Sequence, residues 1–405
     1  MIIGGDYVNR DDFEILNTGV IYFDNGATTL KPKKVLASIE DYYNKYTANA
    51  HRGDYDNSLR VDTLYENTRI KVKNLIGADR PEEIVFTKGT TESLNMIVFG
   101  FMKNYLKKGD EILITKAEHA SNVLPWLELE KSLGVVIKYI PLDNEYKLTM
   151  DNLLSKITDK TKVISIAHIT NTIGDERPIK EIGKLCKEKN IYFVLDCAQS
   201  IPHKKISVKD LNVSFLAFSG HKMCAGTGVG VLYGKYELLD KLIPLNYGGG
   251  MNSYFEENLD IEYKSLPTRL EAGTPNIEGV ISLGSAIDYL ESIGFNKIES
   301  YEKDLRKYLV DKLSLIPNVT IYNKNINTGI VLFNLNDVFA QDTAVYLNNY
   351  HICVRAGNHC TKMLKDELGI KNTCRISLYF YNTKEEIDRL IDVLEKSENI
   401  FKEVL

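Results

Sequence analysis

The sequence predicts an α/β protein: a seven-stranded, mostly parallel sheet with helices on both faces, joined to a smaller α+β domain. Two observations carry this prediction. Between residues 82 and 234, short runs rich in β-branched residues alternate with helical patterns, which is typical of βαβ units and of a parallel sheet covered on both faces. After the glycine run at residues 248–250 the pattern changes to longer helices, which marks a second unit.

Seven apolar runs predict the strands of the large sheet. They lie at residues 83–87, 111–115, 135–140, 162–168, 191–196, 213–218 and 229–233. Helical patterns stand between most of these runs, at residues 91–101, 119–133, 150–157 and 179–189. Pro178 precedes the last of these helices, where the fixed φ of proline suits a first turn. The crossovers between the strands are therefore expected to be mostly helical.

The second unit combines helices and strands in separate runs. Helices are expected at residues 280–293 and 296–315, strands at residues 329–334, 352–355 and 375–378, and a closing amphipathic helix at residues 384–398. Thr383 is the expected N-cap of that last helix, and residues 251–276 are expected to be irregular. We predict a large domain of residues 18–278 and a small domain of residues 1–17 and 279–405, which share a cleft.

Length and composition bound the function. The chain has 405 residues, 44% hydrophobic and 26% charged, as in an ordinary globular protein. Its formal net charge of −5 provides no positive field for a polyphosphate, which argues against nucleic acid as a partner. No apolar stretch approaches the roughly 18 residues that span a bilayer, and residues 1–16 lack a signal-peptide run, so we expect no membrane association and a cytoplasmic location. The six cysteines form no Cys-x-x-Cys pair, which predicts neither a disulfide framework nor a metal site.

A lysine and an aspartate at strand ends are the first candidates for chemistry. Lys222 closes the segment Ser219-Gly220-His221-Lys222 after the strand at 213–218, where open α/β sheets place their ligands. Asp196 ends the strand at 191–196 after five apolar residues, and a carboxylate buried there needs a cationic partner. Pyridoxal phosphate suits both groups, because its aldehyde condenses with a lysine amine and its protonated ring nitrogen pairs with a carboxylate. The two residues together indicate this cofactor.

The phosphate of such a cofactor requires hydrogen-bond donors. The segment Lys88-Gly89-Thr90-Thr91-Glu92 lies between the strand at 83–87 and the following helix, so it aims backbone N–H groups at an anion. A capped helix start with a glycine turn explains the same residues without any ligand. Combined with Ser219 and His221, the segment predicts a phosphate site.

Five separated segments resemble one family in order and content. They are Gly89-Thr-Thr-Glu92, Asp196-Cys-Ala-Gln199, Ser219-Gly-His-Lys222, Glu271-Ala-Gly-Thr-Pro-Asn276 and Val354-Arg-Ala-Gly-Asn-His-Cys360. These segments are similar to those of the pyridoxal-phosphate cysteine desulfurases of the SufS type, within the class V aminotransferase group. The likeness runs over residues 22–390, nearly the whole chain. It implies the fold type I of pyridoxal-phosphate-dependent transferases.

The resemblance assigns roles around the cofactor. Lys222 would form the Schiff base and then act as general base at Cα, and Asp196 would keep the ring nitrogen protonated. Gln199 would donate to the phenolic oxygen, and His119 would stack on the ring and take part in catalysis. The residues implied to hold the phosphate are Thr90, Thr91, Ser219, His221 and, from a neighbouring subunit, Thr274. A homodimer is implied in the same way.

The resemblance also implies a substrate, L-cysteine. Arg375, assisted by Asn171, would bind the α-carboxylate, since a planar guanidinium grips a carboxylate with two hydrogen bonds. Arg355 would face the substrate as well. His51 would contact the substrate or a partner near the entrance.

The thiol that the resemblance makes the nucleophile is Cys360. It stands beside arginine and histidine in the sequence and just before a helical pattern at residues 362–368, a setting that favours nucleophilic thiols. It would attack the γ-sulfur of the bound cysteine, carry the sulfur as a persulfide and release alanine. The other five cysteines are given structural roles. The implied partners are a sulfur acceptor of the SufE or SufU type and a scaffold for iron–sulfur cluster assembly.

Other functions fit parts of the same pattern. A selenocysteine lyase uses the same cofactor geometry, and another class V aminotransferase or lyase would carry Cys360 incidentally. A non-catalytic scaffold would keep the fold but needs none of the charged and nucleophilic positions. The sequence departs from many relatives at Asn358, at Cys224-Ala225-Gly226 and at Thr361-Lys362-Met363, which leaves rate and partner open while sparing the residues that the reaction requires.

Overall fold

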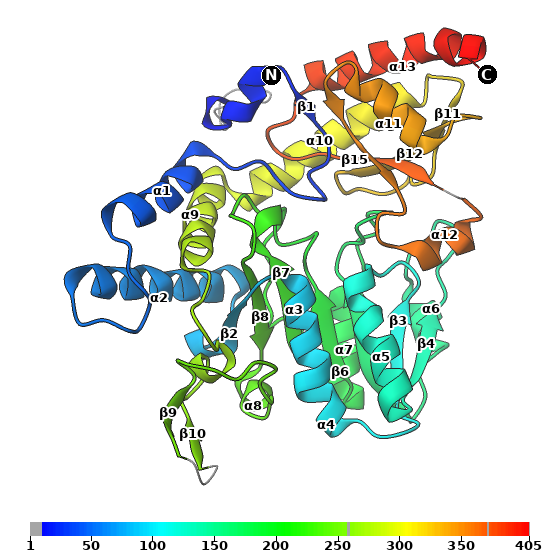
Figure 1. Ribbon diagram of the computed structural model, residues 1–405. Coiled ribbons are helices and arrows are strands. Elements are labelled where there is room, and N and C mark those ends of the chain that lie inside the picture. The colour runs from blue at the N-terminus through cyan, green and yellow to red at the C-terminus, as the bar shows by residue number, and fades with distance from the viewer. Residues whose placement is uncertain (1–9, 257–259, 371, 405) are drawn as a thin grey trace.

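The computed structural model describes residues 10–256, 260–370 and 372–404, and its centre is a seven-stranded sheet (Figure 1). The strands in spatial order are β2 (Ile84–Thr87), β8 (Gly230–Gly234), β7 (Phe215–Ser219), β6 (Tyr192–Asp196), β5 (Thr161–Ala167), β3 (Glu111–Thr115) and β4 (Val136–Ile140). β8 runs antiparallel to both of its neighbours, and the remaining pairs are parallel. The predicted mostly parallel sheet is therefore confirmed.

Both faces of this sheet are covered, which explains its near-continuous apolar strands. Every residue of β3, β7 and β8 is buried. In β3, Leu113 faces one hydrophobic cluster, while Ile112 and Ile114 face a second one on the opposite side. α7 (Ile179–Lys189) and α2 (Asp56–Ile76) contribute to the first cluster, and α5 (Leu124–Leu133) to the second. Burial on two faces removes the polar alternation of a one-sided strand.

Several helices differ from the sequence-based expectation. The helix predicted at 119–133 is divided into a 3-10 turn (Ala120–Asn122) and α5, because Pro125 lacks an N–H and fits only in a first helical turn. The helix predicted at 91–101 begins as α3 (Thr90–Asn95), continues as a π-helical segment (Met96–Met102) and ends as α4 (Lys103–Tyr105). The remaining short helices of this unit are α6 (Met150–Leu154) and α8 (Tyr236–Leu239).

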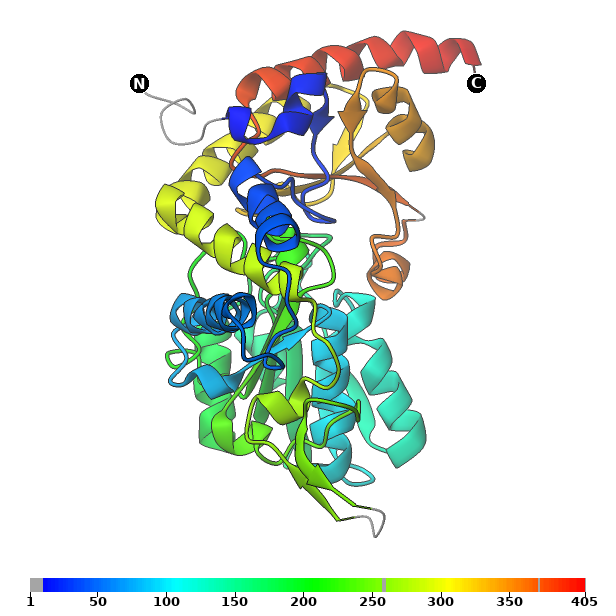
Figure 2. The same ribbon diagram turned by 60° about the vertical axis from the view of Figure 1, so that its left-hand side comes forward.

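Several elements lie where none was predicted, among them two long helices and a hairpin. α1 (Lys33–Lys45) follows Pro32, and α2 packs beside it against α9 (Ile277–Ile293). The stretch expected to be irregular holds a hairpin of β9 (Asn252–Phe255) and β10 (Ile261–Tyr263), which projects from the large unit (Figure 2). Most of its side chains are exposed, so no burial pattern marked it in the sequence.

The second unit is built on a four-stranded antiparallel sheet in the order β11 (Val319–Ile321), β12 (Ile330–Leu335), β15 (Thr373–Ser377) and β14 (Arg355–Gly357). Its helices are α10 (Phe295–Leu313), α11 (Ala340–Asn348), α12 (Lys362–Leu368) and α13 (Lys384–Val404). The N-terminal strand β1 (Ile21–Tyr22) pairs in parallel with β13 (Ile352–Cys353), so the beginning of the chain joins this unit (Figure 1). The predicted domain boundaries, after residue 17 and after residue 278, remain a proposal. Within the described ranges, no helix is both long and apolar enough to cross a membrane.

Candidate active site

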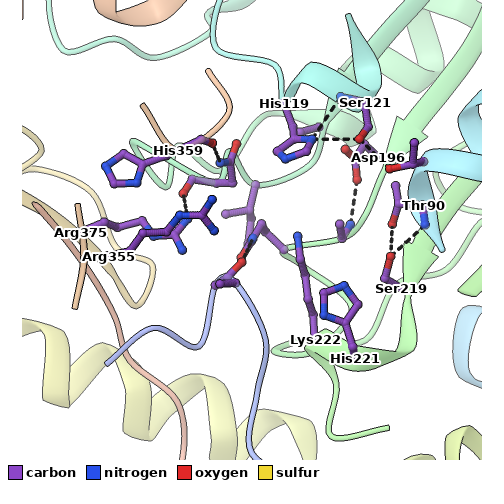
Figure 3. A pocket seen from close by; sticks show the side chains of 18 residues that line it. Thr90, His119, Ser121, Asp196, Ser219, His221, Lys222, Arg355, His359 and Arg375 are labelled. Carbon is purple, nitrogen blue, oxygen red and sulfur yellow. Dashed lines mark hydrogen bonds between the residues drawn. The ribbon is translucent and has the colours of Figure 1, made fainter. Parts of the chain in front are cut away.

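A cavity of about 210 Å³ lies where the strands of the large sheet end and the second unit begins (Figure 3). Its lining residues are Gly26, Ala27, Thr90, Thr91, His119, Ser121, Ala167, Ile169, Asn171, Asp196, Ala198, Gln199, Ser219, His221, Lys222, Arg355, His359 and Arg375. Most of the residues that the sequence singled out meet here. Cys360, His51 and Thr274 are the predicted site residues that do not line it.

The floor of the cavity joins the predicted acid and amine. Asp196 ends β6, and Lys222 lies one short 3-10 turn beyond the end of the neighbouring β7. Asp196 is 5% exposed; burial raises the pKa of its carboxyl to about 6, although the N–H of Ala198 donates to it at 2.9 Å. Burial lowers the pKa of Lys222 to about 8, with the nearby guanidiniums of Arg375 and Arg355 acting in the same direction. An amine with a lowered pKa is a better nucleophile and base at neutral pH.

Beside this pair, the start of α3 meets the end of β7. The Oγ of Ser219 accepts the backbone N–H of Thr90 at 2.8 Å and lies 2.7 Å from its Oγ1. A Cβ at Gly230 would lie 2.4 Å from the Cα of Gly89, so only glycine lets β8 pass directly beneath the loop. Gly89 itself has a φ of 154°, which favours glycine. Hydroxyls and N–H groups at a helix start form a suitable site for a phosphate. We call the group of Gly89, Thr90 and Ser219 the phosphate cradle.

Two histidines border this cradle as neutral rings. Burial lowers the pKa of both His119 and His221 to about 4. The backbone N–H of Ser121 donates to the Nδ1 of His119 at 3.1 Å, which fixes the ring at the cavity wall (Figure 3). Gln199 donates from Nε2 to the carbonyl of Gly26 at 2.8 Å.

The opposite wall carries the arginines of the second unit. Arg375 is 1% exposed, and its Nη1 donates to the carbonyl of Asn171 at 2.8 Å. Its Nη2 pairs with the Oδ1 of Asp24 at 2.8 Å, and its Nε has no partner among the described residues. Burial lowers the pKa of this guanidinium. A buried cation that lacks a full set of acceptors suits an anionic ligand group.

Cys360 lies beside the cavity, in the loop between β14 and α12, as an exposed residue between the buried His359 and Thr361. The Nη2 of Arg355 is 3.9 Å from its Sγ. The thiol also acts to raise the pKa of both Lys222 and Arg375, against the stronger effect of burial. Its backbone carbonyl accepts the N–H of Ala120 at 2.9 Å. The loop is thus attached to the large unit while its sulfur remains open to solvent.

The residue before the thiol, His359, was not selected from the sequence. Its ring is buried, and its Nε2 lies 2.9 Å from the Oγ1 and 3.1 Å from the carbonyl oxygen of Thr373. Its own carbonyl accepts the side-chain amide of Asn171 at 2.7 Å. His359 therefore fastens the loop on both sides of the cavity.

All six cysteines lie within the described ranges as free thiols, and they differ sharply in exposure. Cys360 is exposed and Cys353 half-buried, whereas the other four are buried. Burial raises the pKa of Cys186, Cys224 and Cys374 to about 12. Buried thiols of this kind are inert, and Cys360 is the most exposed of the six.

His51 and Thr274 lie together in another part of this chain. His51 contacts the carboxylate of Glu66 at 3.4 Å, which raises the pKa of its ring. The Oγ1 of Thr274 accepts from the side-chain amide of Asn49 at 3.4 Å, and Thr274 lines a separate groove of about 450 Å³. Within a single chain these two residues do not reach the cavity. The role predicted for Thr274 concerns a neighbouring subunit and stays a prediction.

Comparisons with known proteins agree with this site. Residues 21–390 match the family described as Aminotransferase class-V. A probable cysteine desulfurase of Halalkalibacterium halodurans is 41% identical over 97% of each chain. Among solved structures, the apo cysteine desulfurase of Thermococcus onnurineus NA1 is 39% identical, with a TM-score of 0.93 over 98% of each chain. The Escherichia coli cysteine desulfurase CsdA (S-sulfonic acid) is 32% identical over 96% of this chain and 98% of that chain, with a TM-score of 0.91.

The chain therefore belongs to the class-V aminotransferase family. Relatives at this level of identity, aligned over nearly their whole length, carry the name cysteine desulfurase, which confirms the resemblance to class V cysteine desulfurases.

Proposed function

We propose that this protein is a pyridoxal-phosphate-dependent cysteine desulfurase that takes sulfur from L-cysteine and releases L-alanine. The observation that carries the proposal is the position of Cys360. It is an exposed thiol beside a cavity that is lined by a lysine, a buried carboxylate and an arginine whose Nε has no hydrogen-bond partner among the described residues. An aminotransferase requires no such thiol.

The residues of the cavity fit pyridoxal phosphate. Asp196 and Lys222 stand at adjacent strand ends, as the ring nitrogen and the aldehyde require, and the glycine-lined start of α3 matches the phosphate. When bound, the cofactor supplies an aldehyde and an electron-accepting ring to the amino group of a substrate. Asp196 would hold the ring nitrogen in its protonated form, and the neutral ring of His119 would provide an aromatic surface for the cofactor.

The remaining groups bind and process the amino acid. Arg375 holds the α-carboxylate, and the amine of Lys222 removes the proton from Cα. The Sγ of Cys360 attacks the substrate sulfur; the carbon–sulfur bond of the substrate breaks, and the sulfur stays on Cys360 as a persulfide. The electron pair of the broken bond stays on Cβ, which takes up the proton that the thiol of Cys360 gave up. Lys222 returns a proton to Cα, and the amino acid leaves as alanine.

We further propose the SufS type, a homodimer and a cytoplasmic location. The predicted phosphate contact of Thr274 from a neighbouring subunit supports the dimer, since this residue stands outside its own chain's cavity. The six free thiols suit a reducing compartment. The exposed sulfur of Cys360 suits transfer to an acceptor protein of the SufE or SufU type and onward to iron–sulfur cluster assembly.

The test measures products and the location of the sulfur together. The holoenzyme is incubated with L-cysteine and a thiol reductant, alanine and sulfide are quantified, and a sample without reductant is digested for peptide mass spectrometry. We expect equal amounts of both products and one added sulfur atom on the peptide containing Cys360. Cys360→Ala should lose sulfide release, whereas Cys353→Ala, the matched control, should retain it. Undiminished sulfide from Cys360→Ala would refute the nucleophile.

A further inference from the structure

The segment of residues 24–29 passes along the cavity and touches groups from both units. Asp24 pairs with Arg375 of β15. The carbonyl of Gly26 accepts the side-chain amide of Gln199 at 2.8 Å, and its N–H donates to the Oγ of Ser377 at 2.7 Å. Within this segment, Asp24 is the residue that bonds to the arginine that would hold a substrate carboxylate.

Asp24 is well placed to orient that arginine. Its Oδ1 accepts the Nη2 of Arg375 at 2.8 Å, while the carbonyl of Asn171 accepts Nη1 at the same distance. Two fixed bonds on different nitrogens define the plane of a guanidinium. The Nε–H, buried and without a partner among the residues described, is left for a ligand. The side chain of Asp24 is 22% exposed, so its charge is less costly to bury than that of Arg375, which is 1% exposed.

Gly26 lies close to the same guanidinium. A Cβ at this position would lie 3.1 Å from both Cζ and Nη2 of Arg375. A larger side chain at this position therefore has to shift the arginine. This contact is independent of the ion pair with Asp24.

We propose that Asp24 is a positioning residue that presents Arg375 to the α-carboxylate of the amino-acid substrate. The proposal rests on the proposed function for the nature of the substrate. It concerns binding alone, so a ligand that undergoes no desulfurisation tests it. L-alanine carries the α-carboxylate, and ethylamine is the same molecule without it.

The experiment titrates the holoenzyme with L-alanine and with ethylamine by calorimetry. We expect Asp24→Ala to lower the affinity for L-alanine about tenfold or more, which corresponds to the loss of a charge-assisted hydrogen bond. The affinity for ethylamine should change less than about twofold. Asp24→Asn keeps an oxygen acceptor and should recover most of the affinity. In L-cysteine turnover the same defect should raise KM and leave kcat nearly unchanged.

An equal loss of affinity for L-alanine and for ethylamine would overturn the proposal, because it would show a general disturbance of the cavity. Unchanged L-alanine binding in Asp24→Ala would overturn it as well, as would an Asp24→Asn variant as weak as Asp24→Ala. If Asp24→Ala fails to fold, Gly26→Ala provides the second test, since it displaces the same guanidinium and should also weaken L-alanine selectively. Absence of sulfide release with intact selective binding would refute the desulfurase function and leave the role of Asp24 standing.

Discussion

Replacing Arg177 by methionine should destabilise the large unit, because this buried guanidinium pairs with two carboxylates, those of Glu118 and Asp175. Arg177 and Glu118 are both 0% exposed and bind each other directly. Glu118 stands immediately before His119, so the pair also supports the wall of the cavity. Methionine removes the cation, keeps an unbranched side chain of similar length and leaves the carboxylate of Glu118 in the interior.

The magnitude follows from the partners that remain. Breaking a buried ion pair costs about 3–5 kcal/mol, since one charge stays behind without compensation. Glu118 keeps three hydrogen-bond donors: the hydroxyl of Thr115, the side-chain amide of Asn122 and the N–H of Ala167. We therefore expect the lower half of that range, about 3–4 kcal/mol.

The assay is unfolding in guanidinium chloride, followed by tryptophan fluorescence. The chain has one tryptophan, Trp126, which is buried and donates to Asn122 at 3.3 Å, so its emission reports on this network. The matched control is Lys184→Met on α7. It breaks a pair with Glu188 whose side chains are 78% and 60% exposed and should cost less than about 1 kcal/mol.

The pH dependence of Arg177→Met provides a second check. Burial raises the pKa of Asp175, and Arg177 counteracts this rise. Without Arg177, the folded protein binds a proton at Asp175 more readily than the unfolded chain does. The stability that the variant loses relative to the wild type should therefore grow as the pH rises and shrink as the pH falls. A loss below about 1 kcal/mol would refute the reasoning, as would a double variant Glu118→Gln/Arg177→Met no more stable than the single one.

Three further predictions concern the cavity. Acid should destabilise the protein, because burial lowers the pKa of His119 and His221 to about 4 and that of His359 to about 3. Below a pH of about 6.5 the unfolded chain takes up protons that the folded rings exclude. The free energy of unfolding therefore falls by up to about 1.4 kcal/mol for each ring and each pH unit. In urea titrations at several pH values, His359→Gln should make this dependence on pH less steep. Gly230→Ala should weaken cofactor binding in equilibrium dialysis, whereas Gly248→Ala, with open space around its Cβ, should not. Lys222→Ala should abolish borohydride trapping of the cofactor, whereas Lys88→Ala, an exposed lysine near the cradle, should retain it.

The fold was predictable where burial leaves a pattern. The central strands of the large sheet stand out because both faces are covered, so most of their residues are apolar. The long helix α2 was missed because its buried side includes Ser58, Thr68 and Arg69, which interrupt the apolar stripe. The β9–β10 hairpin was missed for the opposite reason, since its side chains are largely exposed and nothing selects their type.

The site was predictable where a residue's position in one element already implies its chemistry. Asp196 and Lys222 follow apolar strands, where a charge is unexpected, and this local contrast identified both. Asp24 acts through Arg375, 351 positions away in the chain, and Glu118 acts through Arg177, 59 positions away. No local pattern joins such partners. The sequence therefore revealed the groups that act on a ligand and missed those that orient them.

The loop of Cys360 fits the two tasks that we propose for its thiol. His359 and Cys360 have φ angles of 49° and 59°, a left-handed conformation that costs non-glycine residues about 1 kcal/mol or more each. Contacts outside the loop offset this cost: Asn171 and Ala120 of the large unit bind the two carbonyls, and Thr373 binds the ring of His359. The bonds hold the backbone and leave the Cys360 side chain exposed. A sulfur that accepts an atom from the cavity and passes it to an acceptor outside requires this combination, because a buried thiol would reach only the first partner and a thiol on an unattached loop would lose its alignment with the substrate.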